Sequence, residues 1–129
     1  MVKSVNNNLN KKKRTTSREI AKLVAEAADD VRAENLLVLD LRKLSTFTDY
    51  FIIASGRSDR QVQAISDRIE ETLKKNKHPV IGIEGYEKGH WVLVDAGEVV
   101  AHIFYEEVRN FYALEKLWGE APEVRFRLK

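Results

Sequence analysis

Three side chains that could bind a metal ion or move a proton lie close together in one apolar segment. They are His90, Asp95 and His102, within the sequence HWVLVDAGEVVAHIF of residues 90–104. Imidazole nitrogens and carboxylates are common ligands of zinc, and they are also common acids and bases in enzymes. Both kinds of site require the side chains to converge, so the structure of the segment decides whether such chemistry is available.

The segment contains two runs rich in β-branched residues, on either side of Asp95-Ala96-Gly97-Glu98. This pattern predicts a β-hairpin. We expect Ala96-Gly97 to be a two-residue loop, which determines the residues of the two strands that lie opposite each other. The expected facing pairs are Trp91 with His102, Leu93 with Val100, and Asp95 with Glu98.

The two faces of the predicted hairpin differ in composition, because side chains alternate along a strand. One face is entirely apolar and belongs on a core: Val92, Val94, Val99, Ala101 and Ile103. The other face is mixed: Trp91, Leu93, Asp95, Glu98, Val100, His102 and Phe104. A mixed face of this kind is typical of a recognition surface, but Trp91 and His102 are equally well explained as a partly buried pair.

We predict no metal site, no cofactor and no catalytic residue. In the expected hairpin His90 points away from His102, so the two histidines cannot share an ion, and His78 falls in a polar loop. A catalytic triad could be drawn with Ser55 or Ser58, but neither belongs to the G-x-S-x-G turn that presents a serine nucleophile.

The turn Ser55-Gly56-Arg57-Ser58 has two explanations. It either holds an anion on the amides of the following helix or caps that helix. Capping is favoured, because the spacing matches neither glycine-rich phosphate motif and Asp59 would repel phosphate.

The composition indicates one globular domain. The chain has 129 residues, 43% of them hydrophobic and 33% charged, and it contains no cysteine. This length allows a core of useful size. The lack of cysteine excludes disulfides and thiolate chemistry and fits a reducing cytosol, so we expect a cytoplasmic protein. No membrane association is expected, since no apolar run approaches the roughly 20 residues that cross a bilayer.

Charge is unevenly distributed along the chain. Residues 1–14 carry five cations and no acid: Lys3, Lys11, Lys12, Lys13 and Arg14. The rest of the chain has 17 basic and 20 acidic side chains, a net charge of −3. We expect residues 1–15 to be a disordered basic arm, with a solvated tail favoured over contact with phosphates. The mildly acidic body favours a basic partner surface over direct nucleic-acid binding.

Capping signals and hydrophobic periodicity predict an α/β (α+β) domain at residues 16–119, followed by a C-terminal tail at 120–129. Thr16 and Glu19 have capping-box spacing, and Ser58 is expected to cap a second helix that ends near Asn76. The order α-β-β-α-β-β-β-α gives a mixed sheet of about five strands with helices packed on it. The expected strands are 36–41 (buried on both faces, as in parallel sheets), 51–55, 80–84, the two of the hairpin, and a weak edge strand within 123–129.

A third helix is expected at residues 106–118. Glu107 and Arg109 are most simply its solvated face, whereas Phe111 and Trp118 are most simply core residues.

Three parts of the sequence resemble the ribosomal silencing factor family, also called iojap-like proteins. The first is DYFIIASGRSDRQV at residues 49–62. The second is Glu84-Gly85 followed by Trp91-Val92-Leu93-Val94-Asp95, Gly97, Val99-Val100, His102 and Phe104. The third is Glu107, Arg109, Phe111-Tyr112, Leu114-Glu115 and Leu117-Trp118. Together they extend from about Ser17 to Trp118, nearly the whole chain outside its tails.

The resemblance implies a fold related to nucleotidyltransferases and a bacterial, cytoplasmic protein that represses translation. Members of the family bind a large-subunit ribosomal protein, number fourteen in the usual naming, and sterically prevent the small subunit from joining when nutrients fall. Organelle relatives are associated with large-subunit assembly, an alternative that uses the same surface. The resemblance implies these partner-binding residues: Trp91, Leu93, Asp95, Glu98 and His102.

The fold relationship raises a third alternative, a nucleotide-binding enzyme. A nucleotidyltransferase needs paired carboxylates, typically D-x-D after a Gly-Ser turn, to hold divalent cations. Here the order is Ser55-Gly56, and the neighbouring strand offers Asp40 alone. We therefore expect no enzyme. A homodimer and a minor contact of the basic arm with rRNA are left open.

Overall fold

A six-stranded mixed sheet forms the middle layer of the computed structural model, which describes residues 15–112 and 119–128. Its elements follow the expected order, and the weak edge strand expected within 123–129 is present as a strand of two residues. They are α2 (Ser17–Asp30), β1 (Glu34–Asp40), β2 (Tyr50–Gly56), α3 (Asp59–Lys75), β3 (Gly82–Glu84), β4 (Trp91–Asp95), β5 (Val99–Tyr105), α4 (Glu106–Tyr112) and β6 (Glu123–Val124). The predicted fold class, a mixed sheet with helices packed on it, is confirmed.

The strand order across the sheet is β3-β4-β5-β2-β1-β6. The central neighbours β2 and β5 run parallel, and each of the other neighbouring pairs runs antiparallel. The expectation that strand 36–41 belongs to a parallel arrangement is therefore wrong. Val38 and Leu39 are buried because protein covers both faces of β1, and not because its neighbours are parallel.

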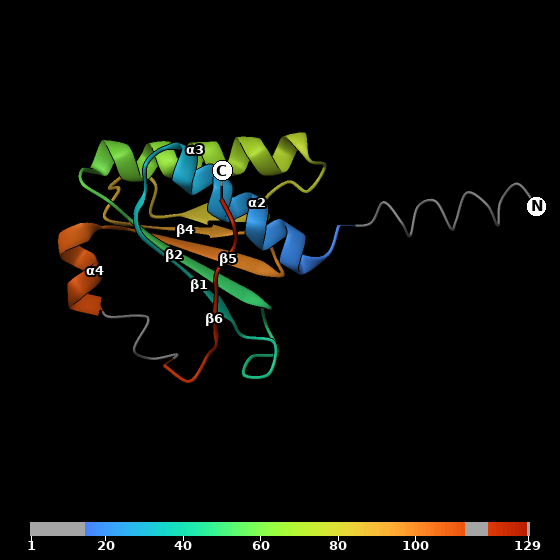
Figure 1. The fold of residues 1–129 in the computed structure, drawn as a ribbon. Coiled ribbons are helices and arrows are strands. Elements are labelled where there is room, and N and C mark those ends of the chain that lie inside the picture. Colours follow the sequence, from blue (N-terminus) through green and yellow to red (C-terminus); the bar gives the residue numbers. More distant parts are fainter. Residues whose placement is uncertain (1–14, 113–118, 129) are drawn as a thin grey trace, which may run out of the picture.

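Helices α2 and α3 cover one face of the sheet, and α4 lies on the opposite side (Figure 1). The main core lies between the sheet and helices α2 and α3, and it includes Val92, Val94 and Ile103 from the hairpin. A smaller cluster lies on the other face, where Phe104 and Ile53 pack with Val108 of α4 and Ala121. The two faces of the hairpin strands therefore meet different surroundings.

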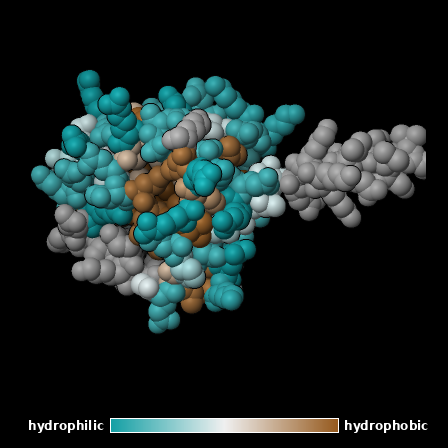
Figure 2. Space-filling view, viewed as in Figure 1, coloured by the Kyte–Doolittle hydropathy of each residue, from teal (hydrophilic) through white to brown (hydrophobic). Residues whose placement is uncertain are grey.

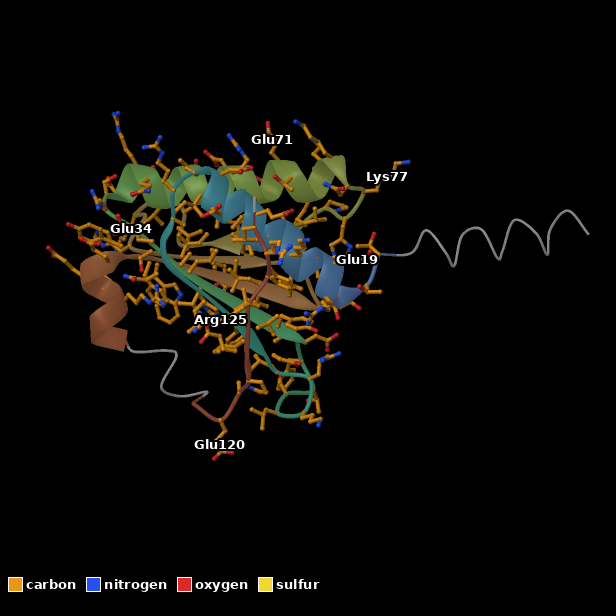
Figure 3. The ribbon with its side chains drawn as sticks, viewed as in Figure 1. Glu19, Glu34, Glu71, Lys77, Glu120 and Arg125 are labelled. Atoms are coloured by element: carbon orange, nitrogen blue, oxygen red, sulfur yellow. The ribbon has the colours of Figure 1, made fainter. Side chains whose placement is uncertain are left out.

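The predicted capping box at the start of α2 is present. Thr16 Oγ1 accepts a hydrogen bond from the Glu19 amide at 3.1 Å, and Glu19 Oε1 accepts from the Thr16 amide at 2.8 Å. Glu19 is labelled at this end of the helix in Figure 3. Each cap satisfies an amide that the helix itself cannot, which typically stabilises a helix by about 1 kcal/mol.

The turn before α3 is a capping turn. Ser58 Oγ accepts from the Gln61 amide at 3.0 Å, and Gln61 Oε1 accepts from the Arg57 amide at 2.7 Å. A Cβ on Gly56 would lie 3.0 Å from Val62, so glycine allows the helix to start this close to the strand. Protein groups therefore occupy two of the amides that an anion would need.

No helix within residues 15–112 and 119–128 is both long enough and apolar enough to cross a membrane.

Candidate docking face

The hairpin turn lies one residue later than expected. The Ala96 amide donates to the Val99 carbonyl at 2.9 Å, so the two-residue loop is Gly97-Glu98 and not Ala96-Gly97. Gly97 has φ +84°, and glycine with a positive φ at the first loop position is typical of a type II′ turn. Asp95 Oδ1 also accepts from the Gly97 amide at 2.8 Å.

The predicted facing pairs are wrong for this reason. The observed pairs are Trp91 with Phe104, Leu93 with His102, and Asp95 with Val100. The loop still has an even number of residues, so every side chain stays on its predicted face. The apolar face is buried against α2 and α3 as expected.

The other face is continuous with β2 and β1. Its side chains form three cross-strand rows. The rows are Asp95-Val100-Phe51-Leu39 at the hairpin-turn end, Leu93-His102-Ile53-Leu37 in the middle, and Trp91-Phe104-Ser55 at the α4 end. We name the partly exposed members of these rows beside the hairpin the docking face: Phe51, Trp91, Leu93, Asp95 and Val100.

Trp91 and His102 interact directly, although they do not face each other in the ladder. The indole Nε1–H donates to His102 Nδ1 at 3.2 Å, along a diagonal of the sheet. His102 is buried, with 5% exposure, and its ring meets that of Phe51 edge-on at 4.6 Å. Trp91 is partly exposed and its ring lies 5.0 Å from that of Phe104. His102 therefore supports the indole from inside the protein, and the Trp91 ring is the one that is partly exposed to solvent.

The environment of His102 keeps its imidazole neutral. Burial lowers the pKa of His102 from its ordinary value of 6.5 to about 4. Because Nδ1 accepts the indole hydrogen bond, the remaining proton is on Nε2. Nε2 is buried and has no hydrogen-bond partner within the described ranges. A neutral, enclosed imidazole supports its neighbour and is poorly placed for proton transfer at neutral pH.

The other histidines do not converge with His102. His90 is exposed and lies 6.1 Å from the Tyr105 ring, measured between centroids. His78 Nε2 lies 3.2 Å from the Ala96 carbonyl oxygen. Among the residues that the structure describes, no group of three His, Cys, Asp or Glu could hold a metal ion.

The hairpin-turn end of the docking face is acidic. Glu98 is exposed in the turn, and its backbone carbonyl accepts from the Asp49 amide at 2.8 Å and the Tyr50 amide at 3.2 Å. These bonds connect the turn to the start of β2. Asp49, Asp95 and Glu98 therefore gather at one end of the sheet, where they favour a basic partner.

Arg109 is not part of a solvated helix face, contrary to expectation. Its side chain is buried, with 7% exposure, and donates to Ser55 Oγ at 2.8 Å and to the Asn35 carbonyl. Since α4 follows β5 without a linker, its first turn lies beside the end of β2 and brings the guanidinium there. Glu107 is exposed as expected. The core assignments of Phe111 and Trp118 lie outside the residues whose side chains are described.

The carboxylate required for the enzyme alternative has a structural partner. Asp40 pairs with Arg42 at 2.7 Å, and the hydrogen bond from this guanidinium lowers the pKa of the Asp40 carboxyl. Ser55 is buried against Arg109, and Ser58 caps α3. Asp40, Ser55 and Ser58 therefore each have a structural role.

Two members of the docking face, Phe51 and Val100, were not among the expected partner-binding residues. Val100 was assigned to the correct face, but nothing local indicated that Phe51 lies beside it. That proximity comes from the parallel pairing of β2 with β5, which joins distant parts of the chain.

Comparison with known proteins identifies the family. Residues 14–129 match the family model described as "Ribosomal silencing factor during starvation". The chain belongs to the ribosomal silencing factor family. The ribosomal silencing factor of Bacillus subtilis (strain 168) is 48% identical over 105 residues, which cover 81% of this chain and 89% of that protein.

Solved structures and a more distant relative extend this result. The crystal structure of protein CV0518 from Chromobacterium violaceum has a TM-score of 0.80 at 38% identity, covering 89% of this ribosomal silencing factor chain and 95% of that one. The mouse protein named "Mitochondrial assembly of ribosomal large subunit protein 1" is 36% identical over 89 residues, 67% of this chain and 39% of that protein. The resemblance seen in the sequence motifs is confirmed.

Proposed function

We propose that this protein represses translation by binding the large ribosomal subunit where the small subunit must join, especially under nutrient limitation. The docking face binds a basic ribosomal protein at that surface, number fourteen in the usual naming. Repression then needs occupancy alone and no catalysis, metal or cofactor. The protein acts in the bacterial cytoplasm, where the subunits join.

The observation that carries this proposal is the partly exposed Trp91 held by buried His102. A partly exposed tryptophan on a mixed sheet face is the kind of residue that dominates binding energy in protein interfaces. Its polar N–H already has a partner inside the protein, so the exposed part of the indole offers mainly apolar surface.

Charge supports a basic partner. Asp95 and Glu98 lie at one end of the docking face, and residues 15–129 carry a net charge of −3. Complementary charges at an interface rim speed association and select partners more than they add affinity. Exposed pairs of this kind also weaken as salt is added.

Co-sedimentation with purified large subunits tests the docking face. We expect Trp91→Ala and Asp95→Arg to remain folded and to lose most of their binding, through lost contact area and reversed charge respectively. Glu71→Arg is the matched control for the charge change, because Glu71 lies on α3 in the helix layer (Figure 3). Undiminished binding by both docking-face variants would exclude this surface.

A second candidate function, assembly of the large subunit, is favoured by the name of the mouse relative. The silencing and assembly roles can be separated by measuring the amounts of free subunits and joined ribosomes in cells with and without the gene. A silencing role predicts more joined ribosomes in starved cells that lack the gene. An assembly role predicts large-subunit precursors in well-fed cells that lack it.

The enzyme alternative is tested by thermal shift. A ligand that binds the native state alone raises the melting temperature. We expect no shift with nucleoside triphosphates and magnesium, and a saturable shift would contradict the non-enzymatic proposal.

A further inference from the structure

The loop between β1 and β2 presents a phenyl ring to solvent. Phe47 is 91% exposed, which is the largest exposure among the large hydrophobic side chains in the described part of the chain, and Leu44 in the same loop is 43% exposed. Figure 2 shows apolar surface at the lower edge of the molecule, where Figure 1 places this loop. We propose that Phe47 is a second anchor for the same basic ribosomal protein, which rests on the proposed function.

The loop holds Phe47 in a defined position. Ser45 Oγ accepts from the Phe47 amide at 3.0 Å and from the Thr48 amide at 3.4 Å. The amides of Leu44 and Ser45 both donate to the Leu41 carbonyl at 2.9 Å. Thr48, next to Phe47, is buried. Because hydrogen bonds already hold the loop backbone in place, the loop loses little conformational entropy when the ring binds a partner, which is the advantage of a preorganised contact.

The loop is continuous with the docking face. It ends at Asp49, whose amide donates to the carbonyl of Glu98 in the hairpin turn. Two residues further, Phe51 stands beside Val100 in the first row of the face. In Figure 1 the loop, drawn in blue-green, extends beyond the sheet on the side away from α3. One partner surface can therefore reach both the face and Phe47.

Charge identifies the kind of partner. The neighbours of the loop at this end of the sheet include Asp49, Asp95 and Glu98. Within the loop, Arg42 is paired with Asp40, and the exposed Lys43 is one cation against these three carboxylates. These carboxylates would repel RNA phosphates. A two-fold contact with a second copy would bring the same carboxylates close to one another. A basic protein with an apolar pocket could bury the Phe47 ring and also pair with the carboxylates.

The chain offers a matched control in Ile81, which is 72% exposed. Its amide donates to the Asp95 carbonyl, so it lies at the same end of the sheet. Ile83, two residues further along the strand, packs on the main core beneath the helices. Ile81 itself lies in the bend before β3, with its side chain beside Gly97 of the hairpin turn, and it is not a member of the docking face.

The test measures the affinity of the full chain for purified large subunits at fixed salt and magnesium. We expect Phe47→Ala to bind about thirtyfold more weakly, as truncation of a hot-spot aromatic residue does. Phe47→Leu should recover most of the affinity, and Ile81→Ala should bind like the wild type. The melting temperature of Phe47→Ala should not change, because the ring is exposed.

The outcomes separate this inference from the proposed function. If Trp91→Ala loses binding and Phe47→Ala stays within twofold of the wild type, the inference is wrong and the proposed function stands. If the wild type does not bind large subunits, both fail. If Phe47→Ala instead converts a dimer to a monomer in sedimentation without changing subunit affinity, the occupant is a second copy and the inference is overturned.

Discussion

The two faces of the β4–β5 hairpin come from the same fifteen residues, 90–104, yet they are built for different purposes. The helix-side face consists of small and branched apolar side chains with 0–1% exposure. The docking face consists of partly exposed aromatic and aliphatic groups with Asp95 at one end, and buried His102 supports it from the same side of the sheet. Alternation therefore gives each strand one buried apolar side and one mixed, partly exposed side, and we propose that the mixed side binds the partner.

The largest expected effect is on the helix-side face. Ile103→Ala removes a fully buried side chain from the main core and should reduce the free energy of unfolding by about 4 kcal/mol. Urea titration measures the loss. The folded fraction should still bind large subunits with wild-type affinity. A loss of affinity at full folding would show that the two faces are not separate.

The next largest effect is the pH dependence of stability that is caused by buried His102. Between about pH 6.5 and 4, the unfolded chain binds a proton at His102 that the folded chain does not. The free energy of unfolding therefore falls as pH falls through this window, by up to about 3 kcal/mol from this group. Above pH 6.5 the contribution is constant.

His102→Phe is the control for this pH dependence. Unfolding measured from pH 7.5 to 4 should show a smaller decrease in the variant than in the wild type, because carboxyl groups such as Asp40 remain in both. Equal slopes would mean that His102 is not kept neutral by the fold. At neutral pH the variant also leaves the Trp91 N–H without its acceptor, which should weaken binding to large subunits.

The smallest expected effect is at Leu93, the partly exposed neighbour of Trp91 on the docking face. Leu93→Ala should cost less than about 1 kcal/mol of stability, because part of the side chain is already in water. Binding to large subunits should weaken by about fivefold, as for residues that surround a hot spot. A large stability loss with unchanged binding would reverse the assignment of the two faces.

The sequence predicted the composition of the two faces but not their register. A loop at Ala96-Gly97 and a loop at Gly97-Glu98 have the same number of residues, so both place Trp91, Leu93, Asp95 and His102 on one side. The true loop places Gly97 first, which is where a type II′ turn favours glycine, so the choice of Ala96-Gly97 overlooked a local signal.

The remaining differences are long-range. The contact of Arg109 with Ser55 depends on where α4 lies against the completed sheet. From the sequence alone, a charged residue on a predicted helix was expected to be exposed to solvent. The position of Phe51 on the docking face depends on parallel pairing with Val100. Capping signals, by contrast, act within four residues, and Thr16 and Ser58 both cap as predicted. Helix caps could therefore be predicted from neighbouring residues, whereas contacts between distant parts of the chain could not.

The parallel pairing of β2 with β5 also has a kinetic consequence. Partners in this pair are 49 positions apart in the sequence, as Tyr50 and Val99 are. Contacts between such distant residues form slowly, because a long loop must close before they can be made. During synthesis, the centre of the sheet cannot assemble until residue 105 has left the ribosome. A nascent chain in which β5 is still inside the ribosome therefore lacks the pairing that places Phe51 beside Val100.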